Sequence, residues 1–206
     1  KNPMKGGVDT DWSTVDSEII AKLNEIKNSG GKIAILSSTI ISPSTKKLIT
    51  DFSATYGNVF HVEMDAVSYS GMLDANEASF GVRALPTYNF DNSDVIVSFG
   101  ADFLGNWLNT DYASAYASSR NPTSGKMTKH YQVESTLSLT GSNADERIQI
   151  KPSEQAGLLS NLYSALNGGI ADSRIAKMAN DLANNAGKSI VVCNSNDSEV
   201  QTLVNA

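Results

Sequence analysis

The sequence predicts an α/β fold with a mostly parallel, Rossmann-like sheet and helices on both faces. Short apolar segments alternate with longer segments of helical periodicity along the 206-residue chain. The apolar segments carry few polar residues, as in KIAIL and DVIVSF, which is typical of parallel strands that are buried on both faces. No unit of about 20–50 residues repeats. We therefore interpret residues 1–206 as one α/β domain.

Helices are expected wherever apolar residues recur at helical spacing. In the first helix they recur at i, i+4, i+8 and i+11 from Val15, which forms one face. Pro43 favours the first turn of the second helix, in which Leu48, Ile49 and Phe52 are expected to point inward. The predicted helices cover residues 12–27, 43–56, 71–80, 107–118, 152–166 and 171–186, with a last one after residue 193.

Strands are expected in the apolar segments between these helices. The predicted strands cover residues 32–36, 59–64, 94–99, 129–134, 147–150 and 188–193. Residues 119–126, which include an Asn-Pro pair and a Gly, are predicted to form a polar surface loop. The first residues, KNPMKGG, look like a loop, and the last, SEVQTLVNA, look like a helix without a C-cap. We expect the chain to be a fragment of a longer protein.

Composition and charge exclude several classes of function. Hydrophobic residues make up 40% of the chain and charged residues 18%, which suits a globular core. Sixteen basic residues oppose 22 acidic ones, giving a net charge of −6. An acidic chain without a basic run lacks the electrostatic footprint of a nucleic-acid-binding protein. No apolar run approaches the ~20 residues needed to span a bilayer, so no direct membrane insertion is expected.

The chain is poor in residues that bind metals. Cys193 is the only cysteine, which excludes an internal disulfide, a Cys-rich zinc site and an iron–sulfur cluster held by this chain alone. His61 and His130 lie early in predicted strands and are expected to be structural or surface residues. Cys193 is expected to be a buried small hydrophobe, and Trp12 and Trp107 are expected to be packing anchors.

The loops that follow the predicted strands are the candidate binding site. In open α/β sheets, ligands bind beyond the carboxyl ends of the strands. These loops are rich in residues that hydrogen-bond small ligands, although the same residues also make good turns and helix caps. Asp65, Asp102 and Glu134 stand at the ends of three strands and could converge for acid–base chemistry, or could serve as caps. The loops are residues 37–39, 65–70, 100–102, 134–136 and 194–197.

Sequence motifs for common chemistry are absent. The segment Gly100–Gly105 follows a strand but lacks the second Gly of G-x-G-x-x-G, which lets a pyrophosphate approach the backbone. There is no Walker A sequence, and no Gly stands two residues before Ser70 to make a nucleophile elbow. A generic nucleotide-binding module therefore remains only a third alternative.

Three segments, taken in order, resemble the molybdopterin oxidoreductase family. They are KIAILSSTIISPSTKKLI, SFGVRALPTYNFDNSDVIVSFGADFLGNW and QVESTLSLTGSNADERIQIKPSEQAGLLSNLYSAL. The last contains landmarks of that family, Ala144-Asp145 and Lys151-Pro152, followed by a helix. The resemblance covers about residues 10–166. It implies a Rossmann-like fold and a cofactor pocket at the strand ends.

Departures from the family pattern argue against a bound cofactor. The family's "GsNp" segment has become Gly100-Ala101-Asp102-Phe103, which puts an acid where an anionic cofactor would lie. Its "DPR" segment has become Glu134-Ser135-Thr136, and the Gly and Asp of "PGtD" are replaced around Glu154. Ser68 or Ser70 nominally occupies the place of the metal ligand, but no Arg follows. The resemblance thus implies no cofactor; molybdopterin guanine dinucleotide, bound together with missing domains of a catalytic oxidoreductase, is the alternative.

The segments DAVSYSGMLDAN and HYQVESTLSLTGSNADERI are most similar in sequence to the large molybdopterin-like, iron–sulfur subunits of bacterial alternative complex III. This resemblance implies a cofactor-free structural domain in a membrane-associated, quinol-oxidising electron-transfer complex. It implies no independent enzyme activity, a place on the periplasmic side of the membrane, and partners among the parent subunit's other domains and the complex's other subunits.

No catalytic or metal-binding residue is predicted. The residues expected to line a vestigial pocket are Ser38, Ser68, Ser70, Gly100, Asp102, Glu134, Ser135 and Glu154.

Overall fold

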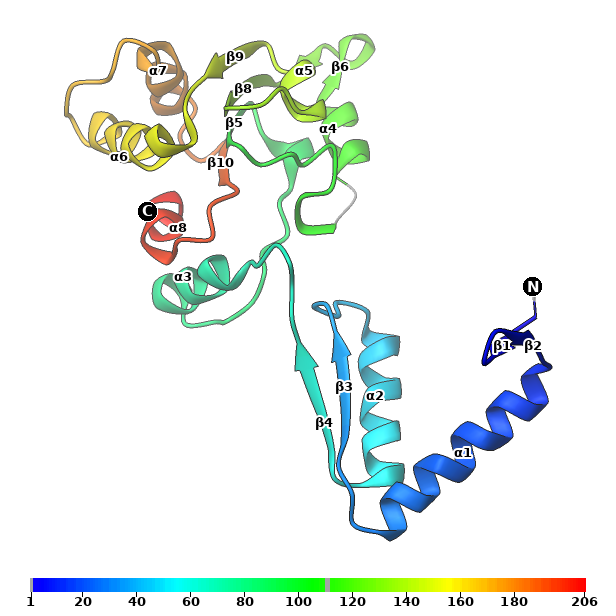
Figure 1. Ribbon diagram of the computed structural model, residues 1–206. Coiled ribbons are helices and arrows are strands. Elements are labelled where there is room, and N and C mark those ends of the chain that lie inside the picture. The colour runs from blue at the N-terminus through cyan, green and yellow to red at the C-terminus, as the bar shows by residue number, and fades with distance from the viewer. Residues whose placement is uncertain (1, 110–111) are drawn as a thin grey trace. The chain divides into compact units, whose positions relative to one another are not determined.

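The computed structural model describes residues 2–109 and 112–206 (Figure 1). The chain divides into two compact units, Lys1–Ser68 and Tyr69–Ala206, which we call unit 1 and unit 2. Both units contain parallel strands connected through helices, which confirms the predicted α/β class. The interpretation of residues 1–206 as one domain stays a prediction. Within the described residues, no helix is long and apolar enough to cross a membrane.

Unit 1 is a small α/β unit with a two-stranded parallel sheet. Strands β3 and β4 pair in parallel, with Ile35 opposite His61. Asp11 caps the first helix by accepting a hydrogen bond from the backbone N–H of Thr14 at 2.9 Å. Its elements are β1 (Met4–Lys5), β2 (Val8–Asp9), α1 (Trp12–Asn28), β3 (Ile33–Ser37), α2 (Pro43–Tyr56) and β4 (Val59–Glu63).

Unit 2 contains a four-stranded parallel sheet in the order β10-β5-β8-β9. Its principal strands and helices are α3 (Ser70–Phe80), β5 (Val95–Phe99), α4 (Ala113–Ser119), β8 (Lys129–Glu134), α5 (Leu139–Ser142), β9 (Glu146–Gln149), α6 (Gln155–Leu166), α7 (Ala176–Asn184), β10 (Ser189–Cys193) and α8 (Ser198–Asn205). A small hairpin, β6 (Arg120–Asn121) and β7 (Lys126–Met127), follows α4. Short 3-10 helices cover Phe90–Asn92, Trp107–Asn109, Pro122–Ser124 and Pro152–Glu154.

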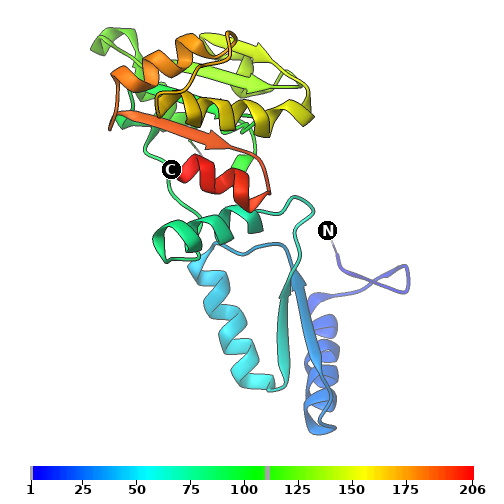
Figure 2. The same ribbon diagram turned by 90° about the vertical axis from the view of Figure 1, so that its left-hand side faces the viewer.

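Helices cover both faces of the unit 2 sheet, as the apolar strands predict (Figures 1 and 2). Val97 and Phe99 of β5 pack with α6, α7 and α8 in one hydrophobic cluster. Ile96, which directly precedes Val97, points to the other face and packs with Phe90 and Phe103 in a second cluster. The alternation of side chains along a strand thus divides one sheet between two cores.

Unit 1 has no comparable core. Among its described residues, 2–68, none is buried. One side of α2 is half-buried against the sheet through Ile49, Phe52 and Tyr56, but Leu48 is 68% exposed, so its predicted inward orientation is wrong. Trp12, expected to be a packing anchor, is also exposed. The helical and strand patterns are therefore present in unit 1 without the burial that normally accompanies them.

Three local predictions differ from the structure. The predicted helix 107–118 is divided into a 3-10 turn and α4, because Leu108 has a positive φ of 60°; residues 110 and 111 lie outside the described residues. The predicted loops at 1–7 and 119–126 instead form parts of the small hairpins β1–β2 and β6–β7. Other boundaries differ mostly by one or two residues, although α7 is shorter than predicted at its start.

We expect Leu162→Ala to lower the free energy of unfolding of unit 2 by about 2–5 kcal/mol, because this side chain is 2% exposed and its loss leaves a cavity. Leu166, one turn later in α6 and 43% exposed, provides the matched control, and Leu166→Ala should cost less. Urea unfolding measured by circular dichroism checks the pair. Equal losses in the two variants would contradict this placement of the core.

Candidate functional site

The carboxyl edge of the unit 2 sheet brings together three of the predicted site residues, Gly100, Asp102 and Glu134. Gly100 and Asp102 follow β5, and Glu134 ends the neighbouring strand β8. The start of α5 lies against both carboxylates, because Ser138 contacts Glu134 and Thr140 contacts Asp102. Convergence of the strand-end carboxylates for acid–base chemistry stays a prediction.

Glu134 is a buried carboxylate held by several donors. It is 4% exposed, and it accepts hydrogen bonds from Arg147 Nε at 2.5 Å and from Ser138 Oγ at 2.6 Å. Gln132 Nε2 donates at 3.1 Å. Burial would raise the pKa of Glu134, but the hydrogen bonds from Ser138 and Arg147 outweigh it and hold the pKa below its usual value. A Cβ at Gly141 would lie 2.0 Å from the carboxylate, so only glycine fits beside it.

Asp102 holds the start of α5. Its Oδ1 accepts hydrogen bonds from Thr140 N at 3.0 Å and Thr140 Oγ1 at 2.7 Å, and Thr140 Oγ1 in turn accepts from Leu104 N. Gly100 has a φ of +69°, and a Cβ there would approach the Asn194 side chain to 2.7 Å. The edge is thus filled by its own side chains, and both carboxylates hold loops in place.

The other predicted residues of unit 2 have hydrogen-bond partners of their own. Ser70 starts α3, and its hydroxyl donates to Asn196 Oδ1 at 3.4 Å. Ser135 is exposed, and its carbonyl accepts from Gln149. Glu154 accepts from the backbone N–H of Lys151 at 2.8 Å and pairs with Arg174. The contacts of Ser135 and Glu154 therefore stabilise local structure.

Ser38, Ser68 and Asp65 belong to unit 1. The Ser38 carbonyl accepts a hydrogen bond from the Ser37 hydroxyl. Asp65 Oδ1 accepts from Thr39 N at 2.7 Å, and its other oxygen accepts from the Thr39 hydroxyl. These bonds, chiefly the one from the Thr39 hydroxyl, lower the pKa of Asp65. Asp65 thus ties together the loops that follow β3 and β4.

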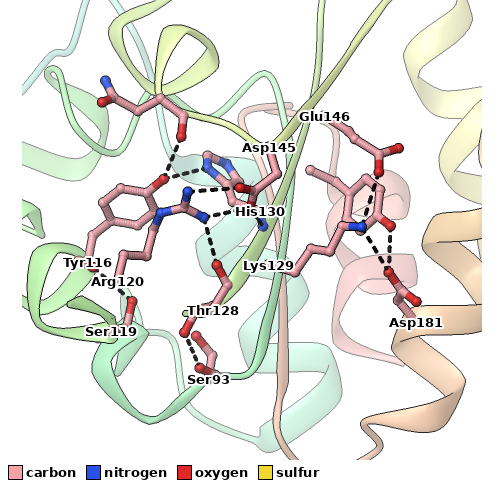
Figure 3. A network of polar contacts seen from close by, with 12 residues as sticks. Ser93, Tyr116, Ser119, Arg120, Thr128, Lys129, His130, Asp145, Glu146 and Asp181 are labelled. Atoms are coloured by element: carbon pink, nitrogen blue, oxygen red, sulfur yellow. Dashed lines mark hydrogen bonds and ion pairs between the residues drawn. The ribbon is translucent and has the colours of Figure 1, made fainter. Parts of the chain in front are cut away.

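A second polar network, which the sequence analysis missed, lies at the amino edge of the unit 2 sheet (Figure 3). Arg120 makes a two-pronged ion pair with Asp145, at 2.6 and 2.9 Å, and donates to the Thr128 carbonyl at 2.7 Å. Asp145 also accepts from the backbone N–H of His130 at 2.8 Å. This network joins the β6–β7 hairpin to the starts of β8 and β9. Hydrogen bonds from Arg120 lower the pKa of Asp145, which is thereby kept ionised.

His130 is fully buried within this network, which refines its expected structural role. Its Nδ1 lies 3.0 Å from the Tyr116 hydroxyl, which donates to the Asn143 carbonyl at 2.9 Å. Desolvation lowers the pKa of His130 to about 4, partly offset by Gln132. The imidazole is therefore neutral at physiological pH. Cys193 is also fully buried, which confirms the prediction that it is a buried small hydrophobe.

Lys129, the first residue of β8, anchors a third group of charges. Its Nζ lies 3.1 Å from Glu146 and 3.7 Å from Asp181, and Tyr131 donates to Asp181 at 2.5 Å (Figure 3). The Glu146 carboxylate also pairs with Lys177 of α7. These contacts join β8, β9 and α7 through their side chains.

A groove of about 440 Å³ lies beside β10. Its walls are mostly apolar and include Val191 and Leu85. The Asn76 amide at its edge is already engaged, because it donates to the Ala84 carbonyl at 2.8 Å and accepts from Asn205 at 3.0 Å. Across residues 2–109 and 112–206, no three His, Cys, Asp or Glu side chains form a group that could hold a metal ion. The described part of unit 2 thus contains polar networks that stabilise the fold, and an apolar groove.

Comparisons with known proteins show a likeness of this chain in fold alone. No protein-family model and no curated protein matches this sequence. One solved structure that matches is the X-ray crystal structure of the formyltransferase/hydrolase complex (FhcABCD) from Methylorubrum extorquens in complex with methylofuran. The match has a TM-score of 0.60 at 15% identity and covers 92% of this chain and 52% of that chain. This chain therefore spans about half the length of the solved chain that it resembles in fold.

The resemblance to molybdopterin oxidoreductases is corrected by these findings. They give no support for that family, for a quinol-oxidising alternative complex III or for electron transport on the periplasmic side; the fold instead resembles that of a chain in the formyltransferase/hydrolase complex. The physical reason is that the three segments behind the resemblance consist of strands, polar turns and helix starts, which any parallel α/β sheet requires. The solved chain belongs to a multi-subunit complex, which supports the coarser expectation of partner proteins. The absence of a cofactor and the periplasmic location stay untested predictions.

We expect Arg120→Met to lower the free energy of unfolding by about 2 kcal/mol, because it leaves Asp145 and the Thr128 carbonyl without their guanidinium partner. Arg83→Met is the matched control, since the Arg83–Asp74 pair is about half exposed. Urea unfolding should show a shifted midpoint for the first variant and an unchanged one for the second. Similar shifts in both would contradict a structural role for the network.

His130 makes stability depend on pH. Its folded pKa of about 4 lies below the unfolded value of 6.5, so the unfolded chain binds the proton more readily and stability falls as pH drops from 6.5 toward 4. We expect a loss of about 2 kcal/mol between pH 7 and pH 5, measured by urea unfolding. His130→Gln should remove most of this dependence. An equal loss in the variant would place the titrating group elsewhere.

Proposed function

We propose that this chain is a non-catalytic structural component that joins partner proteins in a multi-subunit assembly. The observation that carries the proposal is unit 1, which has helices and parallel strands but no buried residue among residues 2–68. Parallel strands are normally covered on both faces, because their side chains are apolar on both. A unit with this pattern and no core is expected to complete its core against another protein.

Exposed apolar side chains of unit 1 support this reading. Leu36, Val62 and Phe60 on the sheet are 70%, 50% and 49% exposed, and Ile19 and Ile20 on α1 are each 52% exposed. Single exposed apolar residues are ordinary on a soluble protein, whereas several on one sheet mark an interaction surface. Ordering the backbone costs about 1–2 kcal/mol per residue, and this cost is offset mainly by burial. Unit 1 therefore gains stability when a partner covers it.

The strand-end carboxylates of unit 2 support a structural rather than a catalytic role. Asp102 and Glu134 are occupied by hydrogen bonds from Thr140, Ser138 and Arg147. A general acid or base needs a pKa near the working pH and contact with substrate. The pKa of Glu134 is shifted the other way, below its usual value. These carboxylates hold α5 and β9 in position through hydrogen bonds.

The reaction class that we propose for the whole assembly is formyl transfer or hydrolysis. The support is the fold of the matched chain, which comes from a formyltransferase/hydrolase complex. Under this proposal the chain supplies contacts and spacing, and other subunits supply the chemistry.

Amide hydrogen exchange tests the proposal. We expect β3 and β4 to exchange quickly in the isolated chain and to become protected in the native assembly, purified through a tag on this chain, because partners cover unit 1 only there. Strands β5 and β8 of unit 2 are the internal control and should be protected in both samples. Strong protection of β3 and β4 in the isolated 21.9 kDa chain, unchanged in the native sample, would contradict the proposal.

A further inference from the structure

The two faces of the β3–β4 sheet differ in burial. Alternation along each strand and the pairing of Leu36 with Val62 place Ala34, Leu36, Phe60 and Val62 on one face. All four are exposed, whereas Ile33, Ile35 and Val59 on the other face are half-buried beside α2. Within unit 1, Figure 1 shows α2 lying along the sheet while α1 points away from it. We call the face formed by Ala34, Leu36, Phe60 and Val62 the open face.

The end of helix α1 lies beside α2. The helix closes with hydrogen bonds from Gly30 N to the Lys27 carbonyl at 3.1 Å and from Gly31 N to the Ile26 carbonyl at 2.9 Å. The Lys27 ammonium also donates to the Thr55 carbonyl, at the end of α2, at 2.7 Å. The nearest helix in the sequence is therefore attached to α2 and leaves the open face uncovered.

The dimensions of the open face fit one helix. Two neighbouring strands are about 4.8 Å apart, and five residues extend about 17 Å. An α-helix is about 10 Å across and covers 17 Å with about 11 residues, or three turns. The second layer on a parallel sheet is normally helical, as α2 is on the other face.

The charge at one end of the open face indicates how such a helix would run. Lys32 precedes β3, and its ammonium lies 5.8 Å from the centre of the Phe60 ring. A helix that runs in the same direction as α2 brings its carboxyl end, the negative end of its dipole, to this lysine. An acidic side chain in its last turn would pair with Lys32. The last turn of α1 carries both Glu25 and Lys27, so α1 from a second copy would bring no net negative charge to Lys32.

We propose that the open face binds one amphipathic helix of a partner protein, which runs antiparallel to β3 and β4 and carries an acidic residue in its last turn opposite Lys32. This inference rests on the proposed function, because it names the kind of partner segment that completes unit 1. It concerns a single surface, so it can fail while the chain still belongs to an assembly.

Two synthetic helical peptides of three turns, held helical by a side-chain staple, test the proposal. They share one Leu stripe and differ only in Glu or Lys in the last turn. Titrated into the full 206-residue chain at low salt, the Glu peptide should shift the amide resonances of β3 and β4 and bind about threefold to fivefold tighter than the Lys peptide. Lys32→Glu should reverse this preference, which nonspecific apolar binding would not do.

Leu36→Asp should weaken the Glu peptide at least tenfold, because it puts a charge in the middle of the open face. The matched control is Leu137→Asp, which changes a leucine of unit 2 that is 63% exposed, against 70% for Leu36, and should leave binding within twofold. Equal binding of the two peptides, or equal losses in the two Asp variants, would overturn the proposal. Self-association of the chain that Leu36→Asp abolishes would also overturn it, because a second copy would then be the occupant. Protection of β3 and β4 in the native assembly without peptide binding would reject only this inference.

Discussion

The need to cover both faces of a parallel sheet is the constraint on which the rest of this structure depends. Unit 2 satisfies it within the chain, because α6, α7 and α8 pack on one side and the aromatic cluster around Phe90 and Phe103 packs on the other. Unit 1 has the same strand chemistry but covers only one face, with α2. The difference between the two units is thus one of coverage rather than of sequence pattern, and it leads to the proposal of an assembly role.

The same constraint explains why polar side chains of unit 2 gather at the two edges of its sheet. Strand ends and loops must satisfy their backbone groups where helices press against the sheet. Asp102 and Glu134 do this at the carboxyl edge, and Arg120 with Asp145 does it at the amino edge. Carboxylates with this many donors are stabilised in one position, which suits a scaffold. The residues that looked most reactive are accordingly those most occupied by internal contacts.

Much of the secondary structure could be predicted because apolar periodicity and capping residues are local signals. Pro43 after Ser42 marks the start of α2 correctly, and Gly57 its end. The interruption after Trp107 could not be predicted, because Leu108 takes a positive φ that ordinary leucines avoid. The Arg120–Asp145 pair was missed because the two residues lie 25 positions apart and only the fold brings them together. The family resemblance failed because its landmarks are common to parallel α/β sheets.

The sequence by itself determined the α/β class, the order of most elements and the absence of a cysteine-rich centre, because hydrophobic period and composition are written along the chain. Only the tertiary structure decided which strand-end groups meet, that Asp102 and Glu134 both contact the start of α5, and that Leu48 and Trp12 stay exposed. The physical reason is that burial and hydrogen bonding depend on what packs against a residue. The spacing of apolar residues along a helix or strand is the same whether the surface that covers them belongs to the same unit or to another protein.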